Sequence, residues 1–182
     1  MYQKILVPLD GSKQAESALP LAGKLARIYN AEITLLRVVE YPFEMYSKCQ
    51  SNGLNDSTQT NEKLQTEKDA FCSEAEDYLK QLASIIEKTV SQVSIEVQEC
   101  PVIDAILGTI EKSRIDLIVM STVGQDDNPW MMGAIANRIL REAQVPVILI
   151  RKGAYGSIPD RPRQQGTSIQ KEAWVHPGTL SY

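Results

Sequence analysis

The sequence has few of the residues that build hydrolytic, metal and disulfide sites. It holds one histidine, His176, and three cysteines, Cys49, Cys72 and Cys100, which lack the spacing of metal ligands. It also lacks a Gly-Lys-Ser/Thr phosphate loop and a recognisable set of histidine, carboxylate and nucleophile. An odd number of cysteines indicates reduced thiols in a reducing compartment. We therefore expect a protein that is not an enzyme, with no catalytic residue and no metal site.

Charge of one sign is not in large excess, and long apolar runs are absent. The 19 basic and 23 acidic side chains leave a net charge of −4, which offers no broad basic surface to nucleic acid. No segment approaches the run of about 18 apolar residues that spans a membrane. The first residues, MYQKILVPLD, lack the pattern of a secretory signal. We expect a cytoplasmic protein with no nucleic-acid partner and no membrane contact.

Short apolar runs alternate with amphipathic segments along the first 150 residues. The pattern predicts strands over residues 4–10, 32–39, 93–98, 116–120 and 145–150, and helices over residues 12–29, 62–88, 101–110 and 134–143. Pro20 and Gly23 predict a bend, rather than a break, in the first helix. Strands that alternate with helices form an α/β fold, an open parallel sheet with helices on both faces. Ligands bind such sheets beyond the carboxyl ends of the strands.

Two segments do not follow this alternation. Residues 41–61 are polar and contain Pro42 and Gly53, which is typical of a long loop that acts either as a lid or as a dispensable insertion. Residues 153–182 carry only scattered apolar side chains. We predict one domain over residues 1–152, with a polar insertion at about 41–61, followed by an extension that is mobile alone or docked on a partner.

Polar and glycine residues follow two of the predicted strands. Gly124 and Gly133 stand before a helix, where glycines and a helix N-terminus together suit a phosphate group. The alternative is structural: Gly124 permits a left-handed turn and Gly133 permits close packing of the helix. The role of Asp10 also has two alternatives. Its carboxylate could bind a ribose or adenine edge, or could cap the next helix together with Ser12.

Three blocks of the sequence resemble the universal stress protein family. They are ILVPLDGSKQAESAL near the start, DLIVMSTVG after the fourth predicted strand, and MMGAIANRILREAQVPVILIR near residue 150. The resemblance covers about residues 1–152. It implies a five-stranded parallel sheet in the order 3-2-1-4-5, the adenine nucleotide alpha hydrolase-like fold. It also implies a homodimer joined through the last strand, with Val145, Val147 and Leu149 as candidate interface residues.

The resemblance further implies adenine-nucleotide binding in one branch of the family and none in another. The binding branch carries Gly-x2-Gly-x9-Gly-Ser/Thr, whereas here Ser121 stands first, eight residues separate Gly124 from Gly133, and Ala134 replaces the hydroxyl residue. Some candidate nucleotide contacts match the family directly: Pro8, Asp10, Val38, Met120 and Gly124. The others, Gly133, Ala134 and Ile135, match only if one residue is deleted from the loop.

The altered loop predicts weakened phosphate binding. A carboxylate such as Asp126 or Asp127 at about 6 Å from a phosphate charge is repelled by roughly 3 kcal/mol at an effective dielectric near 20, and Mg²⁺ could reverse that sign. We expect a stress-response regulator that binds ATP or AMP weakly, with Mg²⁺ accompanying ATP. The alternative is a nucleotide-free dimeric interaction module that docks on an unknown protein partner. Slow ATP hydrolysis is a third and less favoured hypothesis.

Overall fold

The computed structural model describes residues 1–41, 58–99, 101–122 and 132–151, and only the helical backbone of residues 58–64. Most of the predicted insertion and all of the 153–182 extension lie outside these ranges. So do Gly124, Asp126 and Asp127. Among the described residues, no helix is both long enough and apolar enough to cross a membrane.

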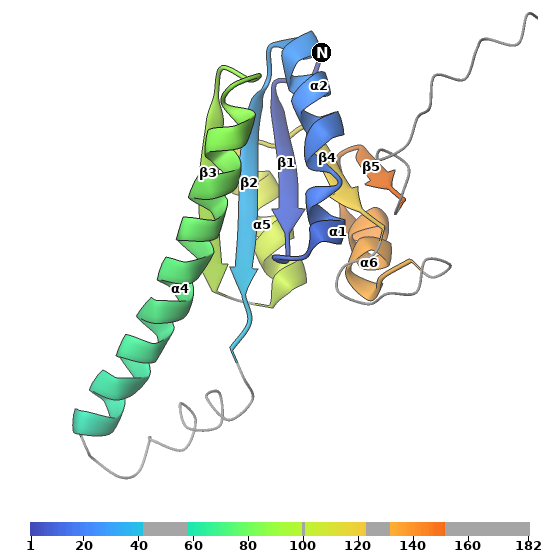
Figure 1. The fold of residues 1–182 in the computed structure, drawn as a ribbon. Helices are drawn as coiled ribbons and strands as arrows, with labels where there is room; N and C mark the ends of the chain where they lie inside the picture. Colours follow the sequence, from blue (N-terminus) through green and yellow to red (C-terminus); the bar gives the residue numbers. More distant parts are fainter. Residues whose placement is uncertain (42–57, 100, 123–131, 152–182) are drawn as a thin grey trace, which may run out of the picture.

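Five parallel strands form one sheet in the order β3-β2-β1-β4-β5, which confirms the predicted topology (Figure 1). The strands are β1 (Lys4–Leu9), β2 (Glu32–Val39), β3 (Val93–Glu99), β4 (Leu117–Ser121) and β5 (Val147–Ile150). Leu9 of β1 lies opposite Arg37 of β2, and Leu6 of β1 lies opposite Ile118 of β4. Ile5, Leu6 and Val7 of the central strand are fully buried. A near-continuous apolar run is expected of a parallel strand that is covered on both faces.

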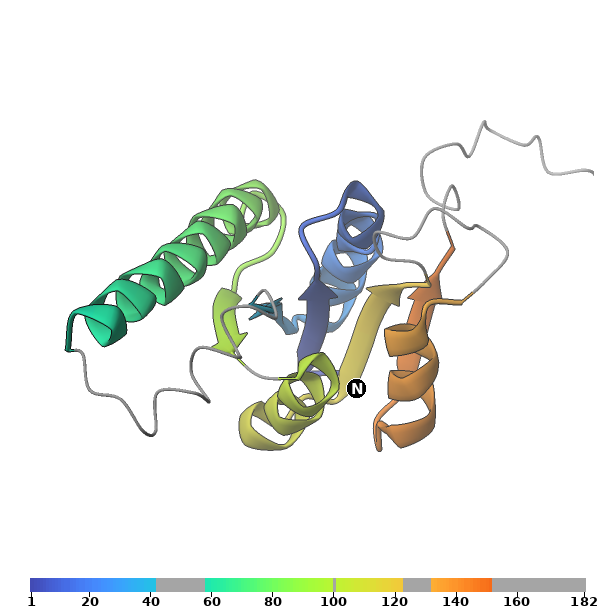
Figure 2. The same cartoon turned by 90° about the horizontal axis from the view of Figure 1, so that it is seen from below.

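Helices cover both faces of this sheet (Figure 2). One face carries α1 (Lys13–Glu16), α2 (Leu19–Tyr29) and α4 (Thr58–Ile86), and the other carries α5 (Val102–Ser113) and α6 (Ala134–Glu142). Alternate residues of β1 serve the two layers, since Ile5, Val7 and Leu9 pack with the first group while Leu6 packs with the second. The α/β fold class predicted from the alternation is therefore confirmed.

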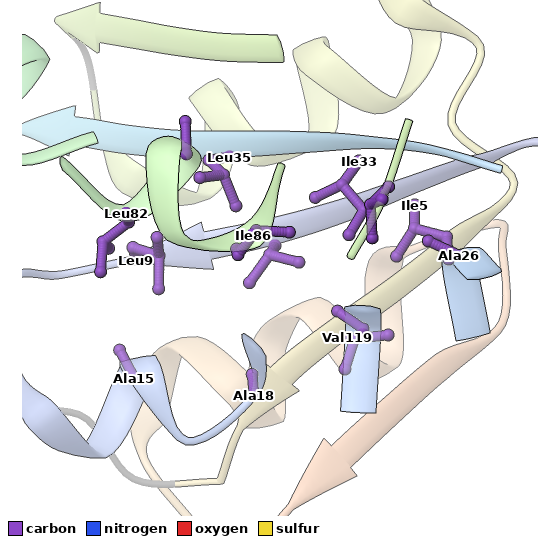
Figure 3. Close-up of a cluster of buried hydrophobic side chains, with 14 of the residues drawn as sticks. Ile5, Leu9, Ala15, Ala18, Ala26, Ile33, Leu35, Leu82, Ile86 and Val119 are labelled. Atoms are coloured by element: carbon purple, nitrogen blue, oxygen red, sulfur yellow. The ribbon is translucent and has the colours of Figure 1, made fainter. Parts of the chain in front are cut away.

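Small side chains bring α1 and α2 close to the central strands. Ala15, Ala18, Ala22 and Ala26 are almost fully buried at helical spacing. Figure 3 shows three of them, Ala15, Ala18 and Ala26, in the same apolar cluster as Ile5, Leu9 and Val119. An alanine stripe lets a helix axis approach a sheet more closely than a leucine stripe would, because less side-chain volume separates the two backbones.

The first helix is broken, so the prediction of a single bent helix was wrong. Ser17 and Ala18 separate α1 from α2, and their N–H groups donate to the carbonyls three residues earlier, Gln14 and Ala15. Pro20 explains the break, because it has no N–H to donate to the carbonyl of Glu16 and its ring crowds that carbonyl. Gly23 lies inside α2 and causes no interruption.

Other boundaries also differ from the prediction, and two of them bear on the insertion and the edge strand. Helix α4 begins at Thr58, so residues 58–61 are helical rather than part of the loop. Its first turns extend beyond the carboxyl edge of the sheet (Figure 1). Strand β5 begins at Val147, because Pro146 donates no hydrogen bond, although its carbonyl accepts one from Ile118 N at 3.0 Å. Val145, a candidate interface residue, therefore precedes the edge strand.

Thr109 of α5 allows a test of how an unpaired buried hydroxyl affects the free energy of unfolding. It is 1% exposed, and its hydroxyl has no hydrogen-bond partner among the described residues. An unpaired buried hydroxyl is destabilising, so Thr109→Val should raise the free energy of unfolding by up to about 1 kcal/mol in urea denaturation.

Thr34 is the matched control for this substitution. It is also buried, but its hydroxyl lies 3.0 Å from Ser94 Oγ in a hydrogen bond between β2 and β3. Thr34→Val should therefore lower the free energy of unfolding by about 1 kcal/mol. Equal destabilisation by both substitutions would contradict the assignment of Thr109 as an unpaired hydroxyl.

Candidate functional site

The carboxyl ends of β1, β2 and β4 place several candidate residues at one edge of the sheet. Asp10 follows β1, while Val38 and Met120 lie near the ends of β2 and β4. The side chains of Val38 and Met120 are buried in the cluster that faces α5 and α6. These two residues therefore offer a ligand their backbone groups more readily than their side chains. Pro8, which is half-buried, lies opposite Leu36 just before this edge.

A polar turn joins β1 to α1. Oδ1 of Asp10 accepts hydrogen bonds from Ser12 N at 2.9 Å and from Ser12 Oγ at 2.6 Å. Ser12 Oγ in turn accepts a hydrogen bond from Ala15 N at 3.1 Å, which caps the N-terminus of α1. The structure thus shows the capping interaction, with Ser12 as the direct cap and Asp10 behind it. This hydrogen-bond chain fixes the carboxylate of Asp10 at the edge of the sheet.

Gly11, between these two residues, adopts a left-handed conformation with φ of +85°. The guanidinium of Arg37 lies beside it: Nη2 is 3.6 Å from the position that a Cβ on Gly11 would take. Arg37 Nη1 also donates to the carbonyl of Leu9 at 3.4 Å. The turn is therefore held from within by Asp10 and Ser12, and from the neighbouring strand by Arg37.

On the other side of the edge, Gly133 immediately precedes α6. Its N–H donates to the carbonyl of Thr122 at 2.8 Å, and Thr122 N donates to the carbonyl of Ile150 at 2.9 Å. The N–H of Gly133 is thus used within the protein and is not offered to a phosphate. A Cβ on Gly133 would lie 3.5 Å from the same carbonyl, an ordinary contact, so packing does not require glycine there.

Helix α6 begins immediately after Gly133, with Ala134 and Ile135 as its first two residues. The first N–H groups of a helix have no intrahelical acceptor and carry a partial positive charge, so they suit an anion. Both residues are exposed. Ala134 adds no hydroxyl, so the phosphate-binding capacity of the described residues comes from backbone groups alone.

A half-buried phenol lies beside the turn after β1. Tyr78 of α4 donates to Oε1 of Glu16 at 3.4 Å, and Oε2 of Glu16 pairs with Lys13 Nζ at 2.8 Å. Burial raises the pKa of Tyr78, and the negative charge of Glu16 adds to the increase. The charge of Arg37 opposes this effect on the pKa, and Asp10 contributes a smaller increase. These charges therefore form one polar cluster, shared by α1, β2 and α4.

Cys72 of α4 lies near the end of β3, where it contacts Tyr41 and Glu99. Its Sγ donates to Glu99 Oε1 at 3.4 Å and lies 3.6 Å from the hydroxyl of Tyr41. Burial raises the pKa of the Cys72 thiol, which makes the reactive thiolate scarcer at neutral pH. Cys49 and Cys100 lie outside the described residues. Within the described ranges, no group of three His, Cys, Asp or Glu side chains is arranged to hold a metal ion.

Two hollows of about 500 Å³ each lie away from the carboxyl edge of β1 and β4. One is a groove between α2 and α4, lined largely by apolar groups that include Leu19, Leu82 and Ile85. The other lies at the amino end of β3, between Glu32 and Glu87. Neither hollow is lined by a candidate nucleotide-binding residue.

The match to a known family covers most of the chain. A model of the universal stress protein family matches residues 1–151. The chain belongs to this family. It is 28% identical over 156 residues to the universal stress protein MJ0531 of Methanocaldococcus jannaschii, with 84% of each chain covered. The resemblance inferred from the three sequence blocks is thereby confirmed.

Solved universal stress protein structures share the fold. UspA from Lactobacillus plantarum superposes with a TM-score of 0.66 at 24% identity, covering 82% of this chain and 98% of that chain. The universal stress protein from Archaeoglobus fulgidus in complex with dAMP superposes with a TM-score of 0.57 at 20% identity, covering 82% and 98%. These similarities show the adenine nucleotide alpha hydrolase-like fold.

The sequence pattern led to the edge residues but missed the polar cluster beside them. Arg37 has a visible signal, since it is the charged residue in the middle of the apolar run ITLLRVV. A charge in a central parallel strand must find partners, which marks it as a position to examine. Tyr78 and Glu16 gave no such signal, because each occupies an ordinary position on an amphipathic helix.

Gly11 should be needed for the conformation of the turn. Its φ of +85° is strained for any residue with a Cβ, so Gly11→Ala should lower the free energy of unfolding by about 1 kcal/mol in urea denaturation. Gly108 of α5 is the matched control, because among the described residues nothing outside its own stretch of helix lies within 4 Å of the Cβ it would gain. Gly108→Ala should raise stability by about 0.5–1 kcal/mol. A Gly11→Ala protein as stable as the wild type would contradict this account of the turn.

Proposed function

We propose that this universal stress protein is a regulatory, stress-response protein that binds an adenine nucleotide weakly at the carboxyl ends of β1 and β4. The observation that carries the proposal is the turn after β1, where two hydrogen bonds from Ser12 fix the Asp10 carboxylate. This carboxylate lies at the same edge as the ends of β2 and β4 and the start of α6. The related Archaeoglobus fulgidus protein, solved in complex with dAMP, supports an adenine nucleotide as the ligand class.

The two halves of the proposed site differ in what they offer a nucleotide. The nucleoside half has a fixed carboxylate, Asp10, and the backbone of Val38 as hydrogen-bonding groups. In the phosphate half, the N–H of Gly133 is already bonded to Thr122, and Ala134 has no hydroxyl. Each neutral hydrogen bond that is missing costs about 0.5–1.5 kcal/mol of binding free energy. We therefore infer a preference for AMP over ATP, with Mg²⁺ contributing only when ATP is bound.

The arrangement supports binding rather than turnover. Asp10 is engaged with Ser12, and the phenol of Tyr78 has a raised pKa, so neither is a ready base for activating water. A protein that binds a nucleotide without turning it over reports the nucleotide level through its conformation or its partners. We accordingly propose a sensing role in the cytoplasm, in which occupancy of the site alters the surface offered to a protein partner.

Titration calorimetry of the wild-type protein with adenosine, AMP and ATP tests this proposal. We expect AMP to bind at least as tightly as ATP in the absence of Mg²⁺, and Mg²⁺ to strengthen the binding of ATP alone. Absence of binding by all three ligands would overturn the proposed function. Micromolar affinity for ATP without Mg²⁺ would overturn the inference that phosphate binding is weakened.

Asp10→Asn separates the ligand role of this residue from its role in the turn. Asparagine keeps an oxygen for Ser12 but removes the charge, so affinity for AMP should fall by about tenfold or more. Asp77→Asn is the matched control, since Asp77 is an exposed carboxylate on α4 whose side chain is 67% accessible. Equal affinity in the Asp10 and Asp77 variants would contradict a contact between Asp10 and the nucleotide.

We also propose that two copies of the chain associate through β5. This strand lies at the edge of the sheet, and its side chains Val147, Ile148 and Leu149 are only partly buried. The carbonyl of Pro146 accepts a hydrogen bond from Ile118 of β4, and that of Ile150 accepts one from Thr122, just after β4. Because backbone groups alternate in direction along a strand, those of Val147 and Leu149 point away from β4. An apolar edge with outward N–H and C=O groups tends to pair with another strand.

Replacement of Val147 by lysine should convert the dimer to a monomer in sedimentation velocity. The added charge would have to be buried if a second β5 strand lay alongside it. Ile28→Lys is the control, because Ile28 on α2 is 68% exposed and lies away from β5. Thermal unfolding of both variants would show that each remains folded. A Val147→Lys protein that still sediments as a dimer would overturn the β5 interface.

A further inference from the structure

Arg37 is a cation placed within a buried parallel strand. It lies in β2 opposite Leu9, and its neighbours Leu36 and Val38 are buried. Its own side chain is half-buried, on the face of the sheet that carries α1 and α4. Placing a guanidinium in this position costs desolvation free energy, so it should make compensating contacts.

Those contacts are with the backbone of the turn after β1. Arg37 Nη1 donates to the carbonyl of Leu9 at 3.4 Å, and Nη2 lies 3.6 Å from the position of a Cβ on Gly11. Within the described ranges, Arg37 forms no ion pair. The guanidinium therefore rests on the main chain immediately before and after Asp10. A side chain larger than a hydrogen at Gly11 would contact it directly.

Acidic side chains belong to the same polar cluster as the guanidinium. The charges of Glu16, Arg37 and Asp10 all act on the phenol of Tyr78. Glu16 is itself engaged by Lys13 and Tyr78. The directional hydrogen bond of Arg37 goes to the Leu9 carbonyl.

We propose that Arg37 is a positioning residue for the nucleotide site: it holds the Leu9–Ser12 turn so that the Asp10 carboxylate is oriented toward the ligand before binding. This inference rests on the proposed nucleotide-binding function. A turn that is already ordered loses less conformational entropy when the ligand binds, which appears as tighter binding. Without the guanidinium, the Leu9 carbonyl loses a side-chain donor and the left-handed turn at Gly11 loses its neighbour.

A positioning role predicts a specific pattern across ligands. Arg37 acts on Asp10, which serves the nucleoside half, so Arg37→Met should weaken adenosine, AMP and ATP by the same factor, about tenfold. A guanidinium that touched phosphate would weaken AMP and ATP but leave adenosine unchanged. Arg37→Lys, which keeps the charge and a donor, should recover part of the affinity. Arg27→Met on α2 is the matched control and should bind like the wild type.

A double-mutant cycle tests whether the effect passes through Asp10. In an Asp10→Asn background, Arg37→Met should change the affinity for AMP by less than about twofold, because the group that it positions has already lost its charge. Full additivity of the two substitutions would overturn the positioning role. So would wild-type affinity in Arg37→Met, or a loss confined to AMP and ATP.

Hydrogen exchange of the free protein completes the test. The amides of Gly11 and Ser12 should exchange several-fold faster in Arg37→Met than in the wild type, whereas Arg27→Met should leave them unchanged. This measurement needs no nucleotide, so it tests the hold of Arg37 on the turn independently of the proposed function. Absence of nucleotide binding by the wild type would overturn the proposed function. Unchanged exchange at Gly11 and Ser12 would overturn the role of Arg37 in the turn.

Discussion

The burial of β1 between β2 and β4 is the constraint on which the rest of the structure depends. A parallel strand at the centre of a sheet must pair its backbone on both sides and cover its side chains on both faces, because unpaired polar groups in the interior are costly. Ile5, Leu6 and Val7 meet this requirement with no exposed surface. Helices on both faces and crossover connections between strands follow from it.

The same constraint explains why the chain becomes polar as it leaves β1. The main chain emerges from a fully paired strand into a turn, where its N–H and C=O groups need new partners. Asp10 supplies an acceptor for the amide of Ser12, and Ser12 an acceptor for the amide of Ala15, while Arg37 adds a side-chain donor to the carbonyl of Leu9. The side chains that satisfy the turn are those that the proposed nucleotide site uses or positions. Structural roles and the proposed binding roles thus fall on the same few residues.

Most of the fold could be predicted from the sequence because its elements have strong local signals. Apolar periodicity identified all five strands of the described chain, and the resemblance to the family correctly implied their order. The errors lie where one residue outweighs the periodicity. Pro20 breaks the first helix, and Pro146 delays the start of β5, since proline removes a hydrogen-bond donor. The start of α4 at Thr58 was missed because its first turns are polar and carry no apolar stripe.

The sequence by itself determined the family, the alternation of strands and helices, and the residues that end each strand, because these depend on local pattern and on the order of the blocks along the chain. Only the tertiary structure decided how those ends are used. It showed that Asp10 supports the cap of α1, that Gly133 donates its N–H to Thr122, and that Arg37 reaches across from β2 to the turn after β1. Each of these contacts depends on the register of neighbouring strands or the path of a loop in space, which residue spacing along one strand does not specify.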